Sequence, residues 1–240
     1  MLQISNKIFC DDFIAGLKLE TRLMPSPYCD YPYLVIKGFL PPSLCREIAG
    51  QIRLDSEAER AQVKSTLLHS VVDPSVDESI RKTMIHSMPA AFAAAYELSF
   101  KAHQRQIEEY FHIALTTATT VQVLEYTEGS FYIKHADDSN ELVDAEGQTV
   151  GFVQVAPQRK LTTVLFATSH ADNAADGHYF SGGELCFNYL FDETGAPVCI
   201  RPEAGDMVIF PSNPVYSHEV HPVTGGYRLT LVQWHNGLTT

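Results

Sequence analysis

The sequence contains no apolar run long enough to cross a lipid bilayer and no cluster of basic residues. Its 17 lysines and arginines are outnumbered by 29 aspartates and glutamates, which gives a formal net charge of −12. Nucleic acids and anionic membranes select for clustered lysine and arginine, so we expect neither as a partner. The segment around Asp11 and Asp12 also lacks the unbroken apolar stretch of a signal peptide, which predicts a cytoplasmic location.

Cysteines are few, scattered and odd in number, and none of them belongs to a CxxC pair. Such a pattern indicates neither a disulfide framework nor a zinc knuckle. We therefore expect a free thiol at each of Cys10, Cys29, Cys45, Cys186 and Cys199.

The first half of the chain has helical periodicity. Residues 1–32 are expected to be irregular because prolines gather near their end, and residues 33–37 are predicted to form a strand. A helix with proline in its first turn is predicted from Pro41 to about Glu59. A second helix begins near Pro89, and its apolar stripe includes His103, which we interpret as a core histidine with a hydrogen-bond partner.

After residue 117, short β-prone runs alternate with glycine-containing turns. The predicted strands are 120–126, 130–135, 161–168, 184–189, 197–201, 206–210, 216–221 and 227–234. Helices followed by about eight strands indicate an α+β fold, a double-stranded β-helix (jelly roll) buttressed by N-terminal helices. We expect a single domain over residues 1–240, with 1–117 as mainly helical support and 118–236 as the jelly-roll core. Residues 138–158 and 169–181 are predicted to be loops over one end of it.

His135 and Asp137 lie at the end of one predicted strand. Side chains two residues apart on a strand point to the same face, so both can reach one ion. Imidazole, carboxylate and one further histidine would form the facial triad that holds Fe(II) in non-haem enzymes. The tripeptide by itself, however, favours a simple surface hydrogen bond between the two side chains.

A histidine and an arginine later in the chain change that balance. His218 lies roughly 80 residues after Asp137, and Arg228 follows ten residues after it. We predict that His218 and Arg228 lie on neighbouring antiparallel strands joined by the turn at 225–226, both facing the barrel interior, with the arginine deeper. A buried arginine needs an anion, and its planar fork matches a carboxylate such as the distal one of 2-oxoglutarate. The alternative is a structural salt bridge to an internal Asp or Glu.

Three further histidines lie in the same half of the sequence as these residues. His221 is the rival third ligand, but strand alternation turns it to the opposite face from His218. His170 and His178 lie in the segment predicted to be the second loop, where exposure to solvent is expected and contact with the substrate is the alternative. Glu184 and Glu219 are interpreted as surface or hydrogen-bonding residues.

Several ordered motifs resemble those of the prolyl 4-hydroxylase-like 2-oxoglutarate/Fe(II) dioxygenases, particularly the compact bacterial members. The motifs are Tyr126-Thr-Glu-Gly-Ser-Phe-Tyr-Ile-Lys-His-Ala-Asp137, Arg159-Lys-Leu-Thr-Thr-Val-Leu-Phe166, Ser181-Gly-Gly-Glu-Leu185 and His218-Glu-Val-His-Pro-Val-Thr-Gly-Gly-Tyr-Arg228, followed by Trp234. The resemblance covers roughly residues 33–236, since residues 33–59 are also similar to the entry strand and helix of that family.

The resemblance implies roles for individual residues. His135, Asp137 and His218 match the iron ligands and catalytic centre, and Arg228 matches the anchor for 2-oxoglutarate. Tyr126 matches a tyrosine that touches this cosubstrate. Phe166 stands where many eukaryotic members have tyrosine, so a second hydroxyl on the distal carboxylate would be missing or supplied by Thr162.

The resemblance also implies an Fe(II)- and 2-oxoglutarate-dependent dioxygenase that consumes O2, with ascorbate as a supporting reductant. We expect hydroxylation of an unactivated C–H bond in an amino-acid side chain of a protein or peptide, with a prolyl residue as the leading candidate. One alternative is a tailoring oxygenase that acts on a free amino acid or small metabolite. Another is a non-catalytic, cupin-like metal sensor, against which Arg228 argues because a sensor needs no deep carboxylate anchor.

Overall fold

A computed structural model describes residues 3–5, 8–9, 19–20, 32–54, 59–60, 66–67, 70–71, 80–146, 149–173 and 177–239. Most of the N-terminal segment predicted to be irregular therefore lies outside the described residues. Its described parts are the short strands β1 (Gln3–Ser5), β2 (Ile8–Phe9) and β3 (Leu19–Glu20).

The first described helix, α2 (Pro42–Leu54), begins with the expected proline but is shorter than predicted. Its apolar stripe stops at Ile52, because the positions three and four residues further on are Asp and Ser. Glu59, the predicted end of this helix, lies instead in the short strand β5 (Glu59–Arg60).

The long helix α3 (Ala90–Phe111) confirms the second predicted helix. It ends where His112 adopts a left-handed backbone conformation with φ of 51°. His103 is half-buried on this helix, and its Nδ1 donates to the carbonyl of Ser99 at 2.9 Å, which is the partner expected for it. Neither of these helices is long and apolar enough to span a membrane.

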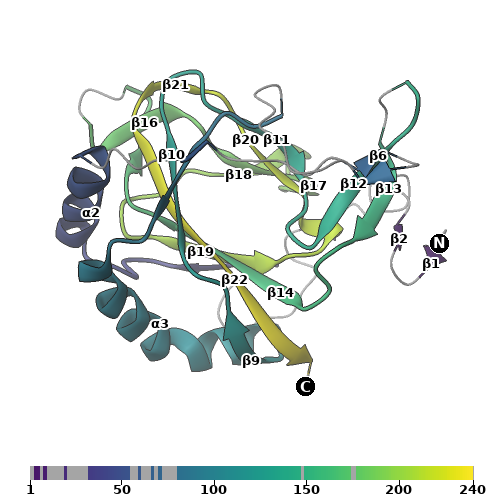
Figure 1. The fold of residues 1–240 in the computed structure, drawn as a ribbon, viewed down its shortest axis with the longest axis horizontal. Coiled ribbons are helices and arrows are strands. Elements are labelled where there is room, and N and C mark those ends of the chain that lie inside the picture. Colours follow the sequence, from purple (N-terminus) through teal and green to yellow (C-terminus); the bar gives the residue numbers. More distant parts are fainter. Residues whose placement is uncertain are drawn as a thin grey trace.

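Two sheets build the barrel. The larger has the order β4-β19-β14-β22-β10-β8-β5, with β9 also pairing with β22, and the smaller has the order β11-β20-β17-β18, with β3 beside β17. The larger sheet contains β4 (Leu34–Ile36), β8 (Met84–Ser87), β9 (Ile113–Ala118), β10 (Gln122–Tyr126), β14 (Arg159–Phe166), β19 (Met207–Pro211) and β22 (Arg228–Thr239). The smaller contains β11 (Tyr132–His135), β17 (Leu185–Phe191), β18 (Pro197–Ile200) and β20 (His218–Val220). All eight predicted strands are confirmed, and the predicted double-stranded β-helix with supporting helices is the observed fold (Figure 1).

Alternation along β22 divides its side chains between two environments. Leu229 and Leu231 are fully buried in the core that the larger sheet shares with α2 and α3. Burial of one such side chain stabilises a fold by about 1.5–3 kcal/mol. The alternate residues, Arg228, Thr230, Val232 and Trp234, line a cavity between the two sheets, as their spacing predicts.

Both segments predicted to be long loops contain strands, so that prediction is wrong. Within residues 138–158, β12 (Ser139–Val143) and β13 (Thr149–Gln154) pair antiparallel as the two strands of a hairpin. Figure 1 shows this hairpin projecting from the side of the barrel away from α2 and α3. It joins β1, β2, β6 (Thr66–Leu67) and β7 (Ser70–Val71) in a further sheet. Polar residues interrupt the apolar alternation of both strands, so the sequence pattern is weak there.

The second of these segments contains β15 (Ser169–His170) and β16 (Tyr179–Gly182). Strand β16 pairs with β15 and with β21 (Val223–Gly226), which makes a small three-stranded sheet. Such short strands depend on distant partners, so local sequence does not reveal them.

A disulfide links Cys186 on β17 to Cys199 on β18, so the prediction of free thiols is wrong for this pair. The two residues lie directly opposite each other in the antiparallel pairing, which their separation of 13 positions does not reveal. Cys45 is a free, buried thiol, and burial raises its pKa to about 12. Cys10 and Cys29 lie outside the described residues.

Replacing Cys186 and Cys199 together with serine should lower the free energy of unfolding by about 2–3 kcal/mol. The link joins residues 13 positions apart in the unfolded chain, and its loss returns the conformational entropy of that loop. Urea unfolding of the wild type and the double variant, with and without reductant, measures the difference. Reduced wild-type protein should unfold at the same urea midpoint as the variant. A wild-type midpoint that does not change on addition of reductant would contradict the presence of the disulfide.

Candidate functional site

Three side chains with metal-ligating atoms converge where the smaller sheet meets the cavity. His135 ends β11, Asp137 follows it, and His218 begins β20 opposite His135 in the strand pairing. One ligand atom from each lies within 4.8 Å of the others. Asp137 is central, with Oδ1 4.0 Å from His135 Nε2 and Oδ2 4.0 Å from His218 Nε2. The structure therefore brings together the three residues that the sequence singles out.

Both imidazole rings are oriented by backbone carbonyls. His135 Nδ1 donates to the carbonyl of Ile133 at 2.9 Å, and His218 Nδ1 donates to that of Tyr216 at 3.0 Å. With Nδ1 protonated, the Nε2 lone pair of each ring is left for a metal. Burial, helped by the nearby His218, lowers the pKa of His135 to about 3, which keeps this ring in the neutral form that binds metals.

The Asp137 carboxylate is held by a neighbouring hydroxyl. Thr162 on β14 donates to Asp137 Oδ2 at 2.7 Å and lies 2.9 Å from the Ser212 hydroxyl. Burial alone would raise the pKa of Asp137, but His218, His135 and the Thr162 hydroxyl outweigh it and lower that pKa. The contact of Thr162 with a cosubstrate stays a prediction, whereas its hydrogen bond to the carboxylate is present.

Thr162→Val should weaken metal binding by about 10- to 100-fold, because hydrogen bonds to a ligating carboxylate fix its orientation and charge. Anaerobic titration with Fe(II) or Mn(II) measures the affinity. Thr162→Ser keeps the hydroxyl and is the matched control, which should bind metal as the wild type does. Equal affinities of the valine and serine variants would show that the hydroxyl does not orient Asp137.

Arg228 is only 1% exposed, at the start of β22. Its Nε donates to the carbonyl of Gly183 at 2.8 Å, and its guanidinium carbon lies 4.5 Å from the Tyr126 ring centre and 5.2 Å from that of Phe166. In the part of the chain that the structure describes, no Asp or Glu forms an ion pair with it, so the alternative of a structural salt bridge finds no partner there. An uncompensated buried cation is unfavourable, so this position fits an anionic ligand.

The paired glycines of the Ser-Gly-Gly-Glu-Leu motif shape the turn against Arg228. Gly182 and Gly183 both have positive φ, at 63° and 62°, a conformation that glycine adopts without strain. A Cβ at Gly182 would lie 2.3 Å from the carbonyl oxygen of Pro222, and one at Gly183 would lie 3.0 Å from Arg228 Cδ. Glycine is therefore required at both positions of the motif, because a side chain would prevent the close approach of the turn to Pro222 and Arg228.

The predicted adjacency of the His218 and Arg228 strands is wrong. Strand β20 lies between β11 and β17 in the smaller sheet, whereas β22 lies between β14 and β10 in the larger one. The chain between them forms β21, which pairs with β16, so residues 225–226 do not close a two-strand hairpin. The cluster of His135, Asp137 and His218 nevertheless lines the same cavity as the arginine.

That cavity has a volume of about 1050 Å³. Its lining includes His135, Asp137, His218, Arg228, Tyr126 and Thr162, together with Arg81, Lys134, Asn140, Glu141, Arg159 and Trp234. Asn140 and Glu141 come from the β12–β13 hairpin and were missed because the segment was predicted to be a loop. The sequence gives only a weak signal for them, because polar residues interrupt the alternation of both strands of the hairpin.

His221 lies outside this cavity lining, as strand alternation predicts. The prediction that His170 is solvent-exposed is wrong, since its side chain is 6% exposed and its Nε2 lies 3.0 Å from Glu184 Oε1. His178 is half-buried.

Comparison with known proteins agrees with this geometry. Residues 121–236 match the family model of the 2OG-Fe(II) oxygenase superfamily. A PKHD-type hydroxylase of Verminephrobacter eiseniae (strain EF01-2) is 41% identical over 59 residues, which is 25% of this chain and only 23% of that relative. A Pseudomonas putida prolyl-4-hydroxylase has a similar structure, with a TM-score of 0.58 and 24% identity over 85% of this chain and 92% of its own. A Trichoplax adhaerens prolyl hydroxylase, solved with a hypoxia inducible factor peptide fragment, has a TM-score of 0.60 and 19% identity over 85% of this chain and 83% of its own.

Proposed function

Residues 121–236 place this chain in the 2OG-Fe(II) oxygenase superfamily, and from that premise we propose that it hydroxylates an unactivated C–H bond of an amino-acid side chain. The leading substrate is a prolyl residue in a protein or peptide. In this proposal His135, Asp137 and His218 hold Fe(II), and Arg228 binds the distal carboxylate of 2-oxoglutarate. We also propose that residues 1–240 act as one domain, with 1–117 as support for the catalytic core in 118–236.

One observation carries this proposal: the three ligands line one cavity together with a buried arginine that has no carboxylate partner among the described residues. A metal sensor would need the ligands alone, whereas a cosubstrate with a keto-acid end and a distal carboxylate needs both. The bound iron would supply the O2 activation that oxidises the C–H bond. The chain would contribute the rest by orienting the ligands, pairing the distal carboxylate and excluding water.

The cavity rim supports a substrate with an apolar group. Ile133 and Val155 both line the cavity and are 40% and 55% exposed, which leaves apolar surface at the opening. A pyrrolidine ring could cover this surface. Lys134 and Glu141, which also line the cavity, form an ion pair with each other at 2.9 Å. A free amino acid or small metabolite remains the second candidate substrate, because a cavity of this size could also enclose one.

Anaerobic addition of Fe(II) and 2-oxoglutarate tests the reaction class through the weak visible absorption of the chelate. We expect the band, and succinate should form when O2 is admitted. Absence of both would exclude the dioxygenase function. Proline-containing peptides and free amino acids, assayed side by side, separate the two substrate classes by which one gains the mass of one oxygen atom.

The cytoplasmic location predicted from the sequence is kept as part of the proposal. A reducing compartment would keep Cys186 and Cys199 as thiols, whereas an oxidising one would retain their disulfide. The state of this pair therefore depends on where the protein works.

A further inference from the structure

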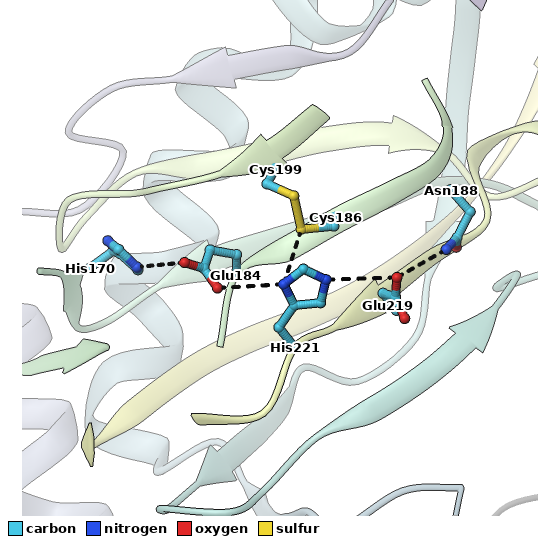
Figure 2. Close-up of a disulfide and its surroundings, with 7 residues drawn as sticks. All are labelled: His170, Glu184, Cys186, Asn188, Cys199, Glu219 and His221. Carbon is cyan, nitrogen blue, oxygen red and sulfur yellow. Dashed lines mark hydrogen bonds and ion pairs between the residues drawn. A yellow bond between two sulfur atoms is a disulfide. The ribbon is translucent and has the colours of Figure 1, made fainter. Parts of the chain in front are cut away.

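The outer face of the smaller sheet carries a second group of metal-ligating side chains (Figure 2). Successive residues of a strand point to opposite faces, so Glu219 and His221 point away from the cavity that His218 lines. Cys186 lies opposite Glu219 in the β17–β20 pairing and opposite Cys199 in the β17–β18 pairing. Three adjacent strands thus present these four side chains on one face.

The His221 ring lies at the centre of the group. Its Nδ1 is 3.7 Å from Cys186 Sγ and 3.7 Å from Glu184 Oε2. Its Nε2, on the other side of the ring, is 3.7 Å from Glu219 Oε1. One ligand atom each from Cys186, Cys199 and His221 lies within 4.8 Å of the others.

Both carboxylates are themselves anchored by second partners. Glu184 Oε1 lies 3.0 Å from His170 Nε2, and Glu219 Oε1 accepts from Asn188 Nδ2 at 3.3 Å. Figure 2 shows the resulting chain of contacts running from His170 through Glu184 and His221 to Glu219 and Asn188. Metal-binding histidines and carboxylates are commonly held by such outer hydrogen bonds.

We propose that the reduced protein binds a zinc ion here through the Cys186 and Cys199 thiolates and His221 Nδ1. Two sulfurs and one imidazole nitrogen form a donor set that zinc prefers, and its tetrahedral geometry leaves one position. Glu184 Oε2 faces the same nitrogen and fills that position. Glu219 Oε1 lies 3.7 Å from His221 Nε2, on the other side of the ring from Nδ1, and would orient the ring with Nδ1 available.

The disulfide and the zinc site are alternative states of one cysteine pair. A dithiol reductant gives two electrons and two protons to the Cys186–Cys199 bond, which becomes two thiols while the reductant becomes a disulfide. Zinc then replaces the two thiol protons, which are released to solvent. Cys199 is exposed, so its sulfur can move away from Cys186 to the spacing that a metal requires.

Cobalt(II) is the probe that tests this site, because thiolate ligation of cobalt produces an intense near-ultraviolet charge-transfer absorption. The His135–Asp137–His218 cluster contains no sulfur and gives no such band. The experiment uses full-length protein with Cys10, Cys29 and Cys45 replaced by alanine. One sample is reduced with a phosphine and desalted anaerobically, and a second is left oxidised. We expect the reduced sample to bind one more equivalent of cobalt than the oxidised one, with the thiolate band, and added zinc to displace it.

Single variants distinguish this site from the His135–Asp137–His218 site. Cys186→Ser should abolish the thiolate band, and His221→Ala should weaken cobalt binding at this site by at least about 10-fold. His218→Ala should keep the band while losing metal at the other cluster. An equal metal content in the reduced and oxidised samples would overturn the proposal. If His221→Ala binds cobalt with the thiolate band and with unchanged affinity, the proposal is likewise overturned, because the cysteines would then bind metal without the histidine.

Discussion

His218→Ala is expected to reduce iron binding and 2-oxoglutarate turnover by more than about 100-fold. Loss of outer hydrogen bonds to metal ligands alone costs 10- to 100-fold, so the removal of a ligand should exceed this. His218 is 5% exposed and its Nε2 is 4.0 Å from Asp137 Oδ2, so the substitution removes one of the three converging ligand atoms. The remaining His135 and Asp137 would hold Fe(II) through only two protein ligands.

Iron stoichiometry after anaerobic loading and desalting measures this effect, with succinate formation as a second readout. His221→Ala, three residues along the chain, is the matched comparison and should retain a full equivalent of iron in the oxidised protein. If His221→Ala loses iron and His218→Ala retains it, the third ligand is assigned to the wrong histidine. His218→Gln, which preserves volume without an imidazole, separates the loss of a ligand from a loss of packing.

Strand alternation explains why the convergence of His135, Asp137 and His218 could be predicted from the sequence. Asp137 lies two residues after His135, the last residue of β11, and His221 is the first residue after the end of β20. Alternation continued past these strand ends predicts that His135 and Asp137 share a face and that His218 and His221 do not. Arg228, Thr230, Val232 and Trp234 line the cavity for the same reason. Such rules depend on local backbone geometry alone, which the sequence specifies well.

Features that depend on which strands become neighbours could not be predicted in this way. Cys186 and Cys199 meet only because β17 pairs with β18, and β20 and β22 separate only because β21 pairs with β16. The β12–β13 hairpin was missed for a related reason, since its polar strands are stabilised by partners elsewhere, including a parallel contact between β12 and β6. Pairings of this kind are decided by tertiary packing, which a local pattern does not report.

Arg228→Met should weaken 2-oxoglutarate binding by at least about 30-fold while leaving metal binding intact. Removing one partner of a buried, hydrogen-bonded charge pair costs about 2–5 kcal/mol, and each 1.4 kcal/mol is about tenfold in affinity. Methionine keeps much of the volume between the Tyr126 and Phe166 rings. The affinity of Arg228→Lys for 2-oxoglutarate should lie between those of the wild type and Arg228→Met, because lysine keeps the charge but loses the planar fork that binds a carboxylate bidentately.

A thermodynamic cycle isolates the contribution of the guanidinium from any change in the fold. Arg228 Nε also holds the carbonyl of Gly183, so the methionine variant could loosen the turn and weaken binding indirectly. The cycle compares 2-oxoglutarate with a 2-oxo acid that lacks the distal carboxylate, each titrated into metal-loaded wild type and variant. If the arginine pairs with that carboxylate, the substitution weakens only 2-oxoglutarate, and the variant binds both acids with similar affinity. Equal weakening of both acids would instead show that Arg228 supports the turn and does not contact the cosubstrate.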